Sequence, residues 1–304
     1  MNTINSSFQM SNSSGQQTSS SSISISNYIL LPILSLTDIF AVAYIIIVLS
    51  RSTLRNNKLN WFTINICLTS ILQSTAMLQS TLRQLFDLST VFSCRLLTYI
   101  SVVGASQIMY SHVVTAISRF LAIVYANKHV FRSTPCALLF IFSGWLIGFV
   151  IVIPYVIIDG FGCSSPTNET FLPYYTITVL LIIPATSVSI CNTLIFLFVR
   201  QSSRRVHTEA GRANPINTRD LRLIKTMIVT FVVFFSGWAP LFIEQTFISM
   251  ISVSKTVDQV FQVLPSISML VDVLLLIYTN QPMRTYLWQL VKRQRQPPAQ
   301  TTVK

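Results

Sequence analysis

Long apolar runs alternate with short polar connections along most of the chain. Seven of these runs are long enough to cross a membrane as helices, because a spanning helix needs about 20 mainly apolar residues. They cover residues 27–50, 60–82, 94–125, 135–157, 172–199, 221–250 and 257–279. The second and seventh runs are diluted by polar side chains, which in a spanning helix usually face the interior of the bundle. The pattern predicts an all-α membrane protein, a seven-transmembrane helix bundle.

Two flanking segments differ from these runs. Residues 1–26 are rich in Ser, Asn, Thr and Gln and contain no charged residue, so they cannot bury enough apolar surface to fold. Residues 281–294 place apolar side chains on one helix face but are too short to span, which predicts a short amphipathic eighth helix on the membrane surface. We therefore expect a disordered N-terminal tail at 1–26, a transmembrane domain at 27–280, and the amphipathic helix with a tail at 281–304.

Composition and charge support this interpretation. Hydrophobic residues make up 51% of the chain and charged residues only 10%, whereas a soluble domain carries about a quarter charged residues. A net charge of +12 would suggest nucleic acid if it lay on one soluble face. Instead, Lys and Arg concentrate in alternate connections, at 51–58, 128–132 and 200–225, and again after residue 283.

This distribution predicts the orientation, because cytoplasmic loops carry the excess of Lys and Arg. We expect the N-terminus outside the cell and the C-terminus in the cytoplasm. The basic segments are then a topology signal that also attracts anionic membrane lipids, and no nucleic-acid partner is expected.

The five cysteines fall into two groups. Cys67, Cys136 and Cys191 lie within or at the ends of the runs, where we interpret them as small apolar residues. Cys94 and Cys163 lie on the predicted outer side, where a pair of cysteines predicts a disulfide.

Three N-x-S/T sequons, at Asn5, Asn12 and Asn168, fall on the same predicted outer side. They are candidate glycosylation sites, although chance matches are common in a Ser-rich tail.

The third run joins the two membrane faces. Arg119 follows Cys94 by 25 positions, a distance of about 37 Å along a helix. The hydrocarbon core of a bilayer is about 30 Å thick, so the cysteine and the arginine are expected near opposite faces.

Further landmarks stand in register with this run. They are Trp145 and Pro154 in the fourth run, Pro184 in the fifth, and Phe234, Trp238 and Pro240 in the sixth. Together with Cys94 and Arg119, they resemble the rhodopsin-like, or class A, G-protein-coupled receptors from residue 27 to residue 293.

Individual motifs carry this resemblance. Ser118-Arg119-Phe120 resembles the Asp-Arg-Tyr motif of that family, and the stretch from Phe234 to Pro240 is similar to its Phe-x-x-Cys-Trp-x-Pro motif, with Gly237 in place of cysteine. Tyr278, followed by the predicted amphipathic helix, resembles the end of the seventh helix.

The resemblance implies a plasma-membrane receptor that binds an extracellular ligand and activates heterotrimeric G proteins. The residues that it assigns to G-protein coupling and the activation switch are Arg119, Ser118, Phe120, Trp238, Pro240 and Tyr278. The candidate ligand-pocket residues, taken by position, are Ser101, Ala105, Trp238, Phe242, Gln245 and Leu264. Trp238 is also open to interpretation as a packing residue.

Several positions depart from the family pattern. Ser118 replaces the acidic neighbour of the arginine, and Ser70 replaces the aspartate of the second helix. Leu274 and Leu275 stand where Asn-Pro is usual in the seventh helix, where Asp272 is a partial substitute. These changes keep two alternatives open: a receptor-like protein with constitutive or no G-protein signalling, and a small transporter, although the internal repeat that a transporter would need is not found.

Two features of the sequence narrow the possible classes of ligand. Ser101 occupies the place of the aspartate that pairs with amines, which disfavours a monoamine, and no lysine lies between Lys255 and Lys292, which excludes a Schiff base with retinal. Glu244 either receives a basic group of the ligand or faces water, and we expect water. His112 is expected to be a hydrogen-bonded core residue.

No pattern of catalytic or metal-binding residues stands out. The three histidines do not cluster with Cys or Asp, and neither a nucleophile elbow nor a phosphate-binding loop occurs. We expect no enzyme activity, no cofactor and no metal.

Overall fold

The computed structural model describes residues 25–86, 94–125, 128–158, 171–209, 216–247 and 254–294. Within these ranges the chain is almost entirely helical. Its elements are α1 Ile25–Ser50, α2 Ser52–Arg55, α3 Lys58–Phe86, α4 Cys94–Val124, the 3₁₀ turn η1 His129–Arg132, α5 Thr134–Ile157, α6 Phe171–Thr176, the π-helical segment η2 Ile177–Ile182, α7 Ile183–Glu209, α8 Ile216–Phe247, α9 Lys255–Thr279 and α10 Gln281–Gln294.

Seven stretches of these helices are long and apolar enough to cross a membrane. They fall in α1, α3, α4, α5, the continuous run from α6 to α7, α8 and α9, as the hydrophobic pattern predicts. The prediction of a seven-transmembrane bundle is therefore confirmed, and α10 occupies the residues predicted for the eighth helix. The sequence pattern did not anticipate the short α2 and η1.

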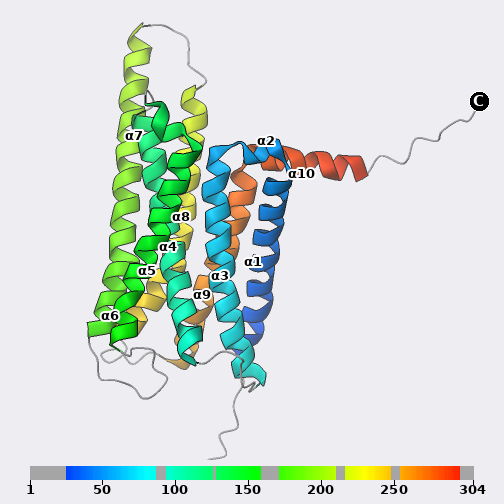
Figure 1. Cartoon of the computed structure of the whole chain (residues 1–304), viewed down its shortest axis with the longest axis vertical. Helices are drawn as coiled ribbons and strands as arrows, with labels where there is room; N and C mark the ends of the chain where they lie inside the picture. The colour runs from blue at the N-terminus through cyan, green and yellow to red at the C-terminus, as the bar shows by residue number, and fades with distance from the viewer. Residues whose placement is uncertain are drawn as a thin grey trace, which may run out of the picture.

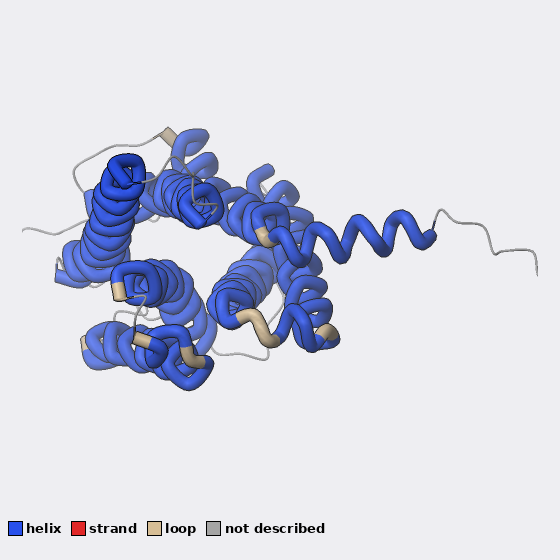
Figure 2. Tube along the Cα trace, turned by 90° about the horizontal axis from the view of Figure 1, so that it is seen from above, coloured by secondary structure: helices blue, strands red, loops and turns tan. Residues whose placement is uncertain are grey.

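The helices stand side by side, and α10 runs across one end of the bundle and away from it (Figures 1 and 2). We call the end that carries α2 and α10 the α10 end, and the other the opposite end. At the α10 end, α7 and α8 project beyond their neighbours (Figure 1). The most enclosed span is that of α4, of which 78% is buried, against 28% for the spans of α1 and α5. The third span is thus the central rod of the bundle.

Proline shapes the fifth span. A proline cannot donate a backbone hydrogen bond to the preceding turn, and Pro184 lies at the second residue of α7, directly after the π-helical segment η2. The wider turn of a π-helix is a common way to accommodate such a break. The chain therefore remains helical from Phe171 to Glu209.

A polar network locks α3, α4 and α5 together. The side chain of Asn65 on α3 donates to Ser111 Oγ on α4 (2.8 Å) and accepts from Trp145 Nε1 on α5 (2.9 Å). Gln107 on α4 donates in turn to the carbonyl of Trp145 (3.0 Å). Buried polar side chains are stable in an apolar bundle only when paired in this way, so Trp145 has a structural role.

A second polar network holds the α10 end. Asn280, between α9 and α10, donates through Nδ2 to Tyr44 OH on α1 and to Asn60 Oδ1 on α3, both at 2.8 Å. Its Oδ1 accepts from the backbone N–H of Met283 (3.4 Å) and so caps α10. Asn60 donates to the carbonyl of Leu54 in α2 (2.7 Å). Asn280 thus links α1, α3 and α10, and Asn60 extends the network to α2.

The network predicts that Asn280→Ala destabilises the bundle. Asn60 Oδ1 and the start of α10 each lose a hydrogen bond, at a combined cost of about 2 kcal/mol. Thermal unfolding of the purified protein should show a clear decrease, whereas Gln281→Ala, at the exposed next residue, should change little. Equal effects of the two substitutions would contradict the role of Asn280.

Candidate functional site

A column of aromatic rings follows the interior face of α8. Phe234, Trp238 and Phe242 are spaced four residues apart, which places them on one helix face, and all three are buried. The ring centroids of Phe234 and Trp238 are 5.9 Å apart, and those of Trp238 and Phe242 are 5.7 Å apart in a stacked arrangement. A change in the packing of one ring therefore reaches the others directly.

The Phe234 end of this column, which is the end nearer α10, meets two ionisable residues from other helices. The imidazole of His112 on α4 lies 4.6 Å from the ring of Phe234, centroid to centroid. Its Nε2 lies 3.3 Å from Asp272 Oδ2 on α9. Asp272 is only 1% exposed, and neither of its carboxylate oxygens has a hydrogen-bond partner among the described residues. His112 is therefore the ionisable side chain that the buried carboxyl group faces.

His112 and Asp272 are both candidates in the sequence, but their contact was not predicted from it. A signal for the pairing was present, because the two residues stand almost equally far along α4 and α9, which begin at Cys94 and Lys255. Both helices start at the opposite end, so equal spacing means equal depth in the membrane.

Close packing of α8 on α9 depends on a glycine. A Cβ at Gly237 would collide with the side chain of Ser268 and lie 3.0 Å from the carbonyl oxygen of Leu264. Gly237 stands where the resembled motif has cysteine, so this departure permits a closer approach of the two helices beside Trp238.

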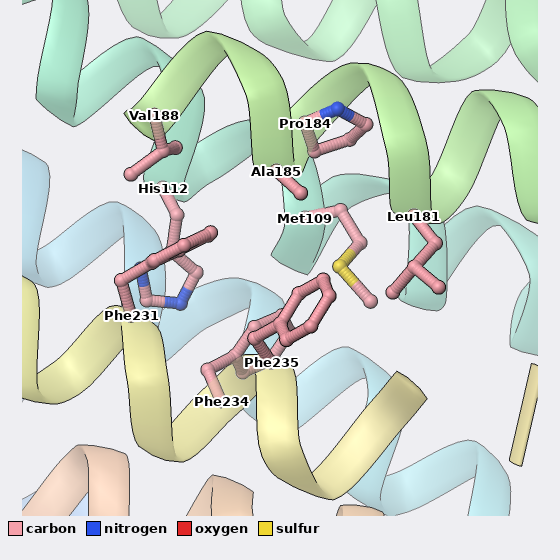
Figure 3. A pocket seen from close by; sticks show the side chains of 9 residues that line it. All are labelled: Met109, His112, Leu181, Pro184, Ala185, Val188, Phe231, Phe234 and Phe235. Atoms are coloured by element: carbon pink, nitrogen blue, oxygen red, sulfur yellow. The ribbon is translucent and has the colours of Figure 1, made fainter. Parts of the chain in front are cut away.

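An apolar hollow lies beside His112 and Phe234, where the fifth span approaches α4 and α8. It contains about 270 Å³ of space, its open part included, between α4, the fifth span and α8. Figure 3 shows Met109, Leu181, Phe235 and the ring of His112 around it. The hollow thus lies between the third, fifth and sixth spans at the depth of His112.

At the α10 end, Arg119 lacks an ion-pair partner on its own helix. Ser118, its neighbour, is buried and carries no charge, and Arg119 Nε and Nη1 are enclosed with no hydrogen-bond partner among the described residues. Phe120 packs against Ile195 and Val199 of α7. No described residue therefore fixes these two nitrogens of Arg119 by a hydrogen bond.

The proposed pocket residues are only partly brought together. Ala105, Trp238 and Phe242 share one buried cluster, whereas Ser101 and Leu264 are half-buried and Gln245 is exposed. Glu244 is 7% exposed, so the expectation that it faces water is wrong: α8 turns Glu244 inward and its neighbour Gln245 outward.

The two remaining switch candidates, Pro240 and Tyr278, lie apart from the aromatic column and the His112–Asp272 pair. Pro240 is a half-buried residue within α8, which continues to Phe247. Tyr278 is 66% exposed and stacks under the guanidinium of Arg284, 5.7 Å from its ring centroid. Its side chain therefore points away from the core.

Other predicted sites cannot be placed. Cys163, Asn5, Asn12, Asn168 and the side chain of Cys94 lie outside the described residues.

The fit of Gly237 against α9 yields a test with a rescue. Gly237→Ala should lower the free energy of unfolding by about 2 kcal/mol, because the added methyl group overpacks the contact. Ser268→Gly, which removes the colliding side chain, should restore most of the loss in the double variant. Ser236→Ala, at an exposed neighbour, should have little effect in the same thermal unfolding assay, and a lack of rescue would contradict the proposed contact.

The His112–Asp272 pair yields a second test. His112→Ala should destabilise the protein by about 1–3 kcal/mol, because it leaves the buried carboxyl group of Asp272 without the side chain that it faces. Asp272→Asn should be milder, since it keeps the shape of the side chain and its capacity for hydrogen bonds. In a double-mutant cycle followed by thermal unfolding, Asp272→Asn should offset part of the cost of His112→Ala, whereas additive effects would exclude an interaction.

Comparisons with known proteins agree with this architecture. The sequence model of the family described as "7 transmembrane receptor (rhodopsin family)" matches residues 41–274. The neuropeptide S receptor of Rattus norvegicus is 27% identical over 173 residues, which cover 49% of this chain and 46% of that receptor. The melatonin receptor type 1B of Gallus gallus is 43% identical over 77 residues, which cover 24% of this chain and 26% of that receptor. Thus the alignments span about half of one curated relative and about a quarter of the other.

These receptors are not enzymes, which agrees with the sequence analysis. The extent of the family match and the seven spans lead to one conclusion: this chain is a multi-pass membrane protein that belongs to the rhodopsin family of G-protein-coupled receptors.

Proposed function

We propose that this protein is a cell-surface receptor in the plasma membrane that binds an extracellular ligand and activates heterotrimeric G proteins. The observation that carries the proposal is Arg119, which lies at the α10 end of the central helix as the family motif requires, with two enclosed donors that no described residue satisfies. A buried cation without a partner is costly, so a partner protein that supplies acceptors would stabilise a conformation in which Arg119 is exposed.

In this proposal the α10 end faces the cytoplasm, as the Lys and Arg distribution predicts. The predicted division into tail, transmembrane domain and C-terminal segment, the Cys94–Cys163 disulfide and the three glycosylation sites belong to the same proposal. All of these features concern the exterior surface or the orientation of the chain.

The switch would work through the aromatic column of α8 and the His112–Asp272 pair. A ligand near Phe242 and Trp238 would change the packing of the aromatic column, and Phe234 would transmit the change to His112. The apolar hollow is lined by His112 and Phe234 and so lies beside both of these rings. If α8 and α9 separate, the His112–Asp272 contact and the Gly237 contact are the interactions that must rearrange. A ligand can shift this equilibrium only by its difference in affinity for the two states.

A second candidate function rests on a specific observation. Because Ser118 cannot form an ion pair with Arg119, the restraint that the family places on its inactive state is absent. A receptor that signals without ligand, or one that no longer signals, is therefore the competing hypothesis. A small transporter is disfavoured by the family match.

Nucleotide exchange on a panel of G proteins tests the proposal. We expect exchange that an agonist from a ligand library raises above the basal rate on at least one G protein, and a reduction by Arg119→Ala of about tenfold, since a charge-assisted contact at such an interface contributes about 1.5–3 kcal/mol. Arg55→Ala, which removes an exposed arginine of α2 at the same end, is the matched control, and surface expression of all variants is measured in parallel. If no G protein responds and Arg119→Ala changes nothing, the chain is not a G-protein activator.

A further inference from the structure

A buried carboxylate lies at the opposite end of α8. Glu244 is almost fully enclosed, and its Oε2 has no hydrogen-bond partner among the described residues. A buried carboxylate without a partner is strongly unfavourable, and most buried polar groups in native structures are paired. An enclosed acceptor of this kind calls for a donor that the described part of the chain does not supply.

A second carboxylate makes this requirement stronger. Asp258 lies in the first turn of α9, the helix that packs against α8. Gln262 donates to Asp258 Oδ1 (2.8 Å), which fixes the orientation of that carboxylate. Two like charges at adjacent helix ends repel each other. A positive group placed between them would remove the repulsion and satisfy Glu244.

The segment of α8 that carries Glu244 also carries buried aromatic rings. Phe242, two residues earlier, is buried and stacks on Trp238. Thr246, two residues later, donates to the carbonyls of Phe242 (2.7 Å) and Pro173 (3.3 Å), which ties this part of α8 to α6. The backbone of α8 beside Glu244 is thus fixed, and the aromatic rings of the same helix lie deeper in the bundle.

We propose that Glu244 and Asp258 bind a positively charged group of the extracellular ligand, a guanidinium or an ammonium, with an apolar or aromatic group of the same ligand packed towards Phe242 and Trp238. This proposal rests on the proposed function, because it takes the opposite end as the side from which the ligand enters. A guanidinium suits the site best, because its planar array of donors can satisfy a carboxylate with two hydrogen bonds. The ligand would then be a basic peptide or a basic aromatic compound.

The cation of this chain nearest in sequence is Lys255, one helical turn before Asp258. Its side chain lies outside the described part of α9. An internal ion pair with Lys255 is therefore the alternative that the experiment must separate from ligand binding.

The test uses the full chain in lipid nanodiscs and a dipeptide probe, N-acetyl-Phe-Arg amide. Its control is N-acetyl-Phe-citrulline amide, which has nearly the same shape but no charge, because acetylation also removes the charge of the terminal amine. We expect the charged probe to bind about tenfold more tightly than the neutral one. Glu244→Gln should abolish this preference and Asp258→Asn should reduce it, whereas Asp38→Asn, which removes a carboxylate from α1, should leave it intact.

Two outcomes would overturn the proposal. The first is the absence of a measurable preference for the charged probe in the unmodified protein. The second is a preference that survives Glu244→Gln, because a neutral amide of the same shape would then suffice.

Lys255→Ala resolves the internal alternative. If the ligand supplies the cation, this variant should bind the probe as well as the unmodified protein does, or more tightly. If Lys255 is the partner, Lys255→Ala and Glu244→Gln should destabilise the protein non-additively and the unmodified protein should show no preference for the charged probe, which would overturn the proposal.

The binding assay contains no G protein, so the two proposals can fail separately. Charge-selective binding without nucleotide exchange on any G protein would contradict the proposed function alone. Exchange that depends on Arg119, without charge-selective binding, would contradict this inference alone.

Discussion

Polar groups in the hydrocarbon core of a membrane must find partners within the protein, and the rest of this structure depends on that constraint. The backbone meets it by forming helices. Hydroxyl side chains meet it locally: Thr37, Thr115 and Thr246 each donate to the carbonyl four residues earlier on the same helix. Asn65 and Asn280 meet it across helices, and their hydrogen bonds determine how α1, α3, α4, α5 and α10 are held together.

The ionisable groups that do not fully meet this constraint lie at three depths of the bundle. Glu244 lies near the opposite end, Asp272 faces His112 in the middle, and Arg119 lies near the α10 end. Each has at least one enclosed atom with no hydrogen-bond partner among the described residues. Polar groups without hydrogen-bond partners are expected at sites where a protein binds a ligand or changes conformation. These depths correspond to ligand recognition, transmission and G-protein coupling in the function that we propose.

The positions that depart from the family motifs also share one explanation. Ser70 and Leu274 remove polar groups that the family motif would place between the second and seventh spans, while His112 and Asp272 supply an ionisable contact between α4 and α9. Gly237 lets α9 approach α8 beside Trp238. The core of this receptor therefore relies on a different set of contacts between the same helices.

Much of the architecture could be predicted from the sequence because it depends on local properties. Span length, the charge of the connections and the amphipathic period are properties of single segments, so the seven spans and the helix at 281–294 were predicted within a few residues. The family followed from motifs such as Ser118-Arg119-Phe120, which are also contiguous.

The rotation of each helix about its axis was decided only by the tertiary structure. Neighbouring helices set this rotation through their packing, and no single segment encodes it. The rotation buries Glu244 and exposes Gln245, turns Tyr278 outward, and brings His112 to within 3.3 Å of Asp272. The sequence by itself thus determined which segments cross the membrane and which family they form, whereas the packing of the helices against one another decided which side chains meet in the interior.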